Sequence, residues 1–187
     1  MQTLGLAKPI PRMESRWRAL FWPEIRSEVD FDYISRQGFW ICSAVATVTL
    51  VVGALSGFIW ESVFESTFFF LAGIGARERS KVAAIAAFAA YFLTALVLQR
   101  YTGSGFGVVR VIFLALLFAN IRGNWLSARW LKAARIDIVP ARQNATLSDK
   151  LADQLPTFLW PKVRFIFYLL ALVEITGLFL ALLGPVG

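Results

Sequence analysis

The sequence predicts an all-α integral membrane protein, a helical bundle of five transmembrane helices with an N-terminal amphipathic helix at the membrane surface. Of its 187 residues, 58% are hydrophobic and only 17% are charged, whereas soluble domains carry about 25% charged residues. Several apolar stretches approach the ~20 residues that cross the hydrocarbon core of a bilayer. The chain has one cysteine and no histidine, which excludes an internal disulfide and every site built on histidine.

Residues 1–37 are predicted to form a cytoplasmic N-terminal segment. Within it, Trp17, Leu20 and Phe21 recur at spacings of three and four, which is the spacing of one face of a helix. We therefore expect an amphipathic helix that lies in the membrane interface with its aromatic side chains in the acyl boundary. The alternative interpretation is an unstructured tail.

The transmembrane domain is predicted to cover residues 38–183, and its first and last spans are the clearest. Residues 38–60 contain no charged side chain, and residues 163–183 come shortly after Pro161, a residue that favours the start of a helix. Both stretches are long enough to cross a bilayer. Residues 184–187 are then a short outer tail.

Three shorter apolar stretches lie between these spans, at 62–76, 82–98 and 106–121. Each is at or below the usual lower limit of ~17 residues for a crossing, so length alone does not show that they cross. If all three cross, the bundle has five transmembrane helices. The alternative has four, with 62–76 forming a re-entrant hairpin built from Gly73 and Gly75.

The distribution of basic residues predicts a cytoplasmic N-terminus and an outer C-terminus. Basic side chains gather in the N-terminal segment, at 77–81 and at 122–162, whereas residues 99–105 carry only one. Lysine and arginine are enriched in cytoplasmic loops, and five crossings place all three clusters on that side. We expect the cytoplasmic loop 122–162 to begin as an interfacial helix and to continue, at 140–156, as an exposed linker.

Three ionisable residues fall at membrane depth: Glu65, Arg110 and Glu174. They are functional candidates because a charge inside the hydrocarbon region is costly. Glu65 and Arg110 lie at similar depth, so they either form a pair or reach the interface by snorkelling. Glu174 lies near the midplane, where it is expected to act as a proton or cation relay, as an anchor to Arg110 or Asn120, or as a contact to another subunit.

Small residues predict close packing of helices. Gly53 and Gly57 form a Gly-x-x-x-Gly motif in the first span, and stretch 82–98 is rich in alanine. Such residues let helix backbones approach closely in lipid. Packing within one chain is the favoured interpretation, and a dimer interface is the alternative.

Basic side chains at the cytoplasmic ends of the predicted helices are candidates for binding anionic phospholipid. They are Arg77, Arg79, Lys81, Arg122 and Arg129. Basic pockets between helices on this side of a membrane bind anionic headgroups. The general enrichment of positive charge on the cytoplasmic side explains the same residues without a lipid site.

Part of the sequence resembles a known group of proteins. The stretches 73–84 (GIGARERSKVAA), 105–110 (GFGVVR) and 120–123 (NIRG) are similar to small multi-pass inner-membrane proteins of bacteria that carry no assigned activity. The resemblance covers the middle of the chain. It implies a bacterial inner-membrane setting and supplies no mechanism.

The function expected from the sequence is that of a non-catalytic membrane protein, an accessory, scaffold or assembly subunit of a membrane complex. We expect no enzymatic activity, no cofactor and no metal site, because histidine, paired cysteines and clustered acids are missing. The expected partners are anionic phospholipid and either other membrane subunits or further copies of the chain, and not nucleic acid. The alternative is a small transporter, channel or lipid-handling protein that uses Glu174 and Arg110.

Overall fold

The computed structural model describes residues 28–133 and 147–184, and the regular structure in these ranges is entirely α-helical. The predicted all-helical class is therefore confirmed for this part of the chain. The predicted amphipathic helix around Trp17 lies outside the described residues. The helices are α2 (Glu28–Leu55), α3 (Ile59–Arg77), α4 (Lys81–Thr102), α5 (Val108–Ala133) and α6 (Leu147–Leu183).

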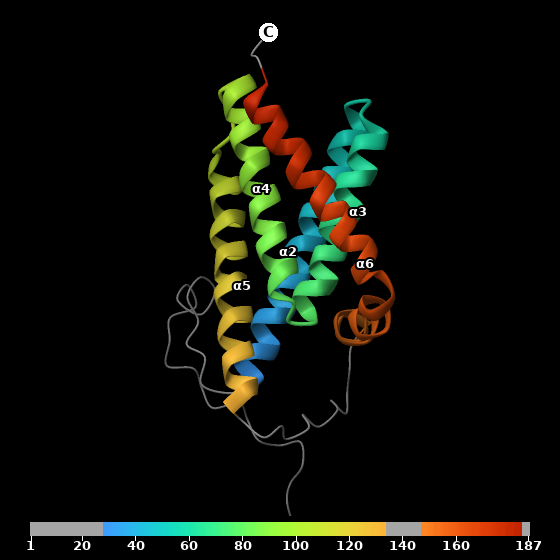
Figure 1. Ribbon diagram of the computed structural model, residues 1–187. Coiled ribbons are helices and arrows are strands. Elements are labelled where there is room, and N and C mark those ends of the chain that lie inside the picture. Colours follow the sequence, from blue (N-terminus) through green and yellow to red (C-terminus); the bar gives the residue numbers. More distant parts are fainter. Residues whose placement is uncertain (1–27, 134–146, 185–187) are drawn as a thin grey trace, which may run out of the picture.

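Successive helices run in opposite directions along the bundle (Figure 1). The turns after α2 and α4 and the end of α6 lie at one end, which we name the upper end. The start of α2, the turn after α3 and the start of α6 lie at the other, the lower end. Helix α3 packs against α2, α4 and α6, and α5 packs against α2 and α4.

Four of the helices contain stretches long and apolar enough to cross a membrane. They are Asp32–Leu55, Lys81–Thr102, Val108–Leu126 and Leu151–Leu183. Helix α3 is not in this set; its first turns carry Glu61 and Glu65, and its last turn carries Arg77. The length and composition of these helices support the prediction of membrane-spanning helices, but they do not establish the predicted number of five.

Helix α2 ends in a turn that depends on a glycine residue. Gly57 has a φ of 84°, the left-handed conformation that glycine adopts without steric cost. The amide of Phe58 donates to the carbonyl of Gly53 at 2.9 Å, and the amide of Gly57 donates to Ala54 at 3.5 Å. These two bonds form a Schellman motif, which satisfies carbonyl groups left over at the end of a helix.

The turn between α3 and α4 has the same hydrogen-bond pattern without glycine. The amide of Ser80 donates to Gly75 at 2.9 Å and that of Arg79 to Ala76 at 3.1 Å. Arg79 occupies the left-handed position with a φ of 59°, which is uncommon for a residue with a side chain. Ser80 then caps α4, because its hydroxyl accepts a hydrogen bond from the amide of Ala83.

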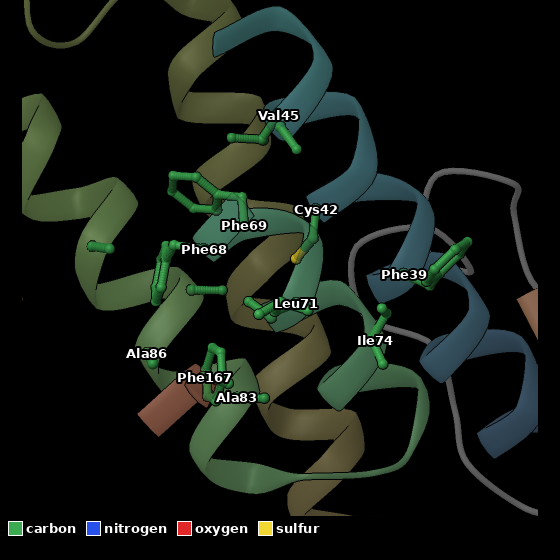
Figure 2. Close-up of a cluster of buried hydrophobic side chains, with 14 of the residues drawn as sticks. Phe39, Cys42, Val45, Phe68, Phe69, Leu71, Ile74, Ala83, Ala86 and Phe167 are labelled. Atoms are coloured by element: carbon green, nitrogen blue, oxygen red, sulfur yellow. The ribbon is translucent and has the colours of Figure 1, made fainter. Parts of the chain in front are cut away.

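The core lies where α2, α3, α4 and α6 meet, and aromatic rings fill much of it (Figure 2). Phe68 and Phe167 are fully buried and stack with ring centroids 5.8 Å apart, and Phe68 also contacts Phe69 edge to face at 5.1 Å. Each aromatic pair of this kind contributes about 0.5–1.5 kcal/mol beyond its buried area. Opposite these rings, the alanines of α4 present a flat surface; the buried ones are Ala83, Ala84, Ala86, Ala87, Ala90 and Ala95.

Helix α3 runs without interruption through the two glycines expected to form a re-entrant hairpin. A side chain at Gly73 would press against Cys42 and the backbone at Phe39 on α2, and one at Gly75 would overlap Ala83 and Trp160. The glycines therefore allow three other helices to approach α3 closely, and no turn occurs between them.

The cytoplasmic loop expected at 122–162 is helical in its described parts, 122–133 and 147–162. Helix α5 continues to Ala133, and α6 begins at Leu147 and contains Pro156 and Pro161 in its interior. The expectation of an exposed linker was wrong for residues 147–156, because they are helical and include the buried Ala152 and Pro156. Proline inside a helix removes a hydrogen bond and bends the axis without always ending the helix, and the first part of α6 turns away from the part that rises through the bundle (Figure 1).

Candidate functional site

The best-defined polar site lies at the lower end, where the guanidinium of Arg77 joins three helices. Its Nη2 lies 2.6 Å from Oδ1 of Asp32 on α2 and 2.6 Å from Oδ1 of Asp153 on α6. Its Nη1 donates to the hydroxyl of Ser35 at 2.6 Å and to the carbonyl of Asp32 at 3.3 Å. Its Nε donates to the carbonyl of Ala152 at 2.9 Å. A guanidinium has five N–H groups, so all of them have a partner.

Pro156 explains why the Ala152 carbonyl is available. In an α-helix this oxygen accepts from the amide four residues later, and here that residue is Pro156, which has no N–H group. Nε of Arg77 supplies the missing donor. Pro156 is itself fully buried, so the bend of α6 and the arginine site form one packed unit.

The environment of Arg77 keeps it charged. Its side chain is only 11% exposed, and this burial lowers the pKa of the guanidinium. The carboxylates of Asp32 and Asp153 act in the opposite direction and more strongly, so the net pKa lies above the ordinary value for arginine. A group whose pKa is raised by folding contributes stability below its unfolded pKa, so this contribution persists across the whole physiological range.

The other lipid-binding candidates lie at the same end as Arg77, in different surroundings. Arg79 occupies the strained turn after α3, and Nζ of Lys81 lies 4.9 Å from the ring centroid of Trp125. Arg122 is half-buried on α5, and the side chain of Arg129 is outside the described residues. Arg77 has no N–H group left for a phosphate, whereas a lipid role for the other four stays a prediction.

Gly53 and Gly57 serve the turn between α2 and α3 in the structure. A side chain at Gly53 would overlap Ser62 on α3, and Gly57 lies in the turn itself with open space around its Cα. Gly53 thus allows Ser62 of α3 to approach α2 closely within the chain. Gly57 lies beyond the helix and supplies the left-handed turn.

Asn120 forms a buried amide site between α2 and α5, away from Glu174. Its Nδ2 donates to the carbonyl of Ile34 at 3.0 Å, and Nδ2 of Asn124 donates to its Oδ1 at 2.9 Å. Both asparagines are at most 3% exposed. The expected anchoring of Glu174 by Asn120 does not occur in the structure.

A second polar group, which we name the polar layer, lies in the upper half of the bundle and consists of Glu65, Tyr91, Thr94, Arg110 and Glu174. The ring of Tyr91 lies 6.0 Å from that of Phe69 on α3 and 6.1 Å from that of Phe113 on α5. Helix α4 runs antiparallel to α3 and α5, and Thr94 lies three residues after Tyr91 on α4. Thr94 is therefore level with the residue four positions before Phe69 on α3 and with the residue three positions before Phe113 on α5. Those positions are Glu65 and Arg110.

Glu174 reaches the same level from α6. The hydroxyl of Tyr101 on α4 donates to the carbonyl of Ala181 at 3.1 Å. Helices α4 and α6 run in the same direction (Figure 1), so Thr94 and Glu174, each seven residues earlier, lie at similar heights. The three charges that the sequence placed at membrane depth therefore lie in one layer.

The charges of the polar layer interact without forming a direct ion pair. Cζ of Arg110 lies 5.8 Å from the ring centroid of Tyr91, and its Nη1 donates to the carbonyl of Gly105 at 3.4 Å. The charge of Arg110 acts on Glu65 and on Tyr91, and that of Glu65 acts on Glu174. Within the described part of the chain, neither glutamate has a hydrogen bond or an ion pair within 4 Å.

Sequence reasoning missed the partners of Arg77, namely Asp32, Ser35 and Asp153. They lie 45, 42 and 76 residues away along the chain, and nothing in their local sequence links them to it. Pro156 carried the one available signal, because a proline inside a helix leaves the carbonyl four residues earlier without its donor.

Within residues 28–133 and 147–184, no three His, Cys, Asp or Glu side chains are arranged to hold a metal ion. Comparisons with protein-family models, with curated proteins and with solved structures gave no match.

Proposed function

We propose that the protein is a five-span membrane protein with a cytoplasmic N-terminus and an outer C-terminus, set in a bacterial inner membrane. The support for a crossing by α3 is its direction and length. It runs from the upper to the lower end between helices that are themselves apolar enough to span, and its 19 residues extend about 28 Å at ~1.5 Å per residue.

Charge and aromatic residues support this orientation. The lower end carries Arg77, Arg79 and Lys81, together with the positive residues that follow α5, and cytoplasmic ends attract such charges. Trp60 and Tyr101 are exposed at the upper end, where their rings suit the headgroup region.

The function we propose is that of a non-catalytic subunit of a membrane complex, and the exposure of α6 carries this proposal. Helix α6 buries 11% of its most apolar stretch, whereas each of the other three apolar helices buries 33%. Phe165 and Leu172 on its outer face are 69% and 65% exposed. Helices in lipid are held by close packing against other helices, so a helix with so little packing in its own chain is suited to receive a helix from another polypeptide.

Photo-crosslinking in the native membrane tests this proposal. A photoreactive amino acid at Leu172 on α6 should give an adduct with a defined second polypeptide. The same amino acid at Val51, an apolar position on α2 that is 51% exposed, should give adducts with lipid alone. Lipid adducts from both positions would contradict the role as a subunit while leaving the membrane topology intact.

The polar layer favours a second candidate, a small transporter that moves an ion past Glu174 and Arg110. Charges from α3, α5 and α6 meet at one level of an otherwise apolar bundle, and ionisable groups at such depth commonly mark ion pathways. Ion flux into vesicles that contain the purified protein tests this candidate. The flux should disappear in Glu174→Gln and persist in Glu61→Gln, which changes an exposed carboxyl group on α3.

A further inference from the structure

The polar layer contains one more negative charge than its single cation balances. Glu65 and Glu174 each contribute a carboxyl group, and Arg110 contributes the one guanidinium. Helix α2 has no charged residue between Arg36 and its end at Leu55, and α4 contributes the neutral phenol of Tyr91. An uncompensated charge in an apolar interior is costly, so the layer is expected to take up one positive charge.

The hydroxyl of Thr94 provides an independent sign of an additional ligand. Its Oγ1 is buried and has no hydrogen-bond partner among the described residues, although threonine in a helix normally bonds to the carbonyl four residues earlier. Thr94 follows Ala87 by seven residues and so lies on the same stripe of α4. That stripe faces α3 and α6, because Ala83 on it contacts the close-packed Gly75.

Glu65 and Glu174 lie at the height of this hydroxyl, on the two helices that the stripe faces. Both side chains are partly buried, and both lie level with Thr94 by the ring and hydrogen-bond contacts of α4. Oxygen atoms are the ligands that small hard cations prefer. Two carboxyl groups and an unpartnered hydroxyl thus lie at one level on three helices that contact one another.

We propose that the polar layer binds one monovalent cation, a proton or a sodium ion, between Glu65, Glu174 and the hydroxyl of Thr94. Arg110 neutralises one of the two carboxyl groups, and the bound cation neutralises the other. This inference names the ligand of the transporter candidate described above. It concerns binding alone, so it holds for a subunit that moves no ion as well.

Infrared spectroscopy of the purified full-length protein tests the proposal without any flux measurement. In a neutral buffer containing choline as the only added cation, the spectrum should show the carbonyl band of a protonated carboxyl group. The band should be lost in Glu65→Gln, in Glu174→Gln or in both. It should remain in Glu61→Gln, and circular dichroism should confirm that each variant is folded.

Replacing choline by sodium at equal ionic strength then distinguishes the two cations. A band that sodium removes identifies a sodium site, and a band that sodium leaves unchanged identifies a proton site. The proposal is overturned if the wild-type band is absent and sodium changes nothing, or if the band survives in the Glu65→Gln/Glu174→Gln double variant. Should Glu174→Gln fail to fold, Thr94→Val, which removes only the hydroxyl, is expected to shift the band or to weaken the sodium response.

Discussion

At the scale of single residues, the guanidinium of Arg77 has a partner for each of its five N–H groups. Its guanidinium reaches carboxylates on α2 and α6 and the carbonyl that Pro156 leaves without a donor. Planar guanidinium groups are well suited to such multiple contacts, and lysine cannot reproduce them. The residue therefore connects α2, α3 and α6 at the lower end of the bundle.

Replacing Arg77 by alanine should destabilise the protein by about 3 kcal/mol, because it leaves the carboxylates of Asp32 and Asp153 partly buried without their partner. Thermal unfolding in detergent, followed by circular dichroism, measures the effect. Arg164→Ala removes an exposed arginine from α6 and should change stability by less than about 0.5 kcal/mol. Equal melting temperatures for the two variants would show that the Arg77 contacts do not stabilise the bundle.

At the scale of helices, glycines set how closely the axes approach. Gly38 receives the side chain of Asn120, and Gly123 receives that of Ile34, so α2 and α5 interlock at two positions. The amide of Asn120 is fixed there by Ile34 and Asn124. A methyl group added at Gly38 would therefore overlap the Asn120 side chain, which these hydrogen bonds hold in place.

Gly38→Ala should lower the free energy of unfolding by about 1–3 kcal/mol, the usual cost of overpacking a well-filled interior. Gly177→Ala is the matched control, because it adds the same methyl group to α6 where nothing lies within 4 Å. Alanine favours a helix over glycine by about 0.8–1 kcal/mol, so this variant should be slightly more stable than the wild type. Chemical unfolding in micelles gives both values, and a stable Gly38→Ala protein would contradict the interlocked packing.

At the scale of the whole molecule, the alternating helix directions place the turns on two opposite ends (Figure 1). Ser56 and Ser104 lie in turns at the upper end, and Glu78 lies in the turn at the lower end. This separation holds across a membrane only if α3 crosses it.

Labelling of single introduced cysteines with an impermeant thiol reagent tests the crossing by α3. Cysteine at Ser56 and at Ser104 should react from the outside of intact cells, and cysteine at Glu78 should react only after the cells are opened. The native Cys42 is buried, which keeps the background low. Reaction of the cysteines at Ser56 and Glu78 from the same side would contradict the five-span topology.

The sequence predicted features that depend on local composition. The apolar stretches became helices, and the alanines of 82–98 became the packing surface of α4. Helix limits were less predictable, because Pro156 lies inside α6 although proline usually ends a helix. The partners of Arg77 depend on which helices become neighbours, and this is decided by packing across 45 to 76 residues of sequence. The polar layer was predicted in part. The similar depth of its charged residues followed from their spacing along the sequence, but the sequence did not predict that α3, α5 and α6 bring them to one layer.

The contacts of Arg77 also have an order in time. During synthesis, Asp32 is made 45 residues before Arg77, so their ion pair can form once α2 and α3 have both been made. The Ala152 carbonyl is made 75 residues later, which at about 5–20 residues per second takes about 4–15 seconds. For that interval, the N–H groups that bind Asp153 and the Ala152 carbonyl in the finished fold have no partner within the chain. A chain that stops before α6 lacks Asp153 and the Ala152 carbonyl, so its Arg77 keeps N–H groups that the finished chain pairs.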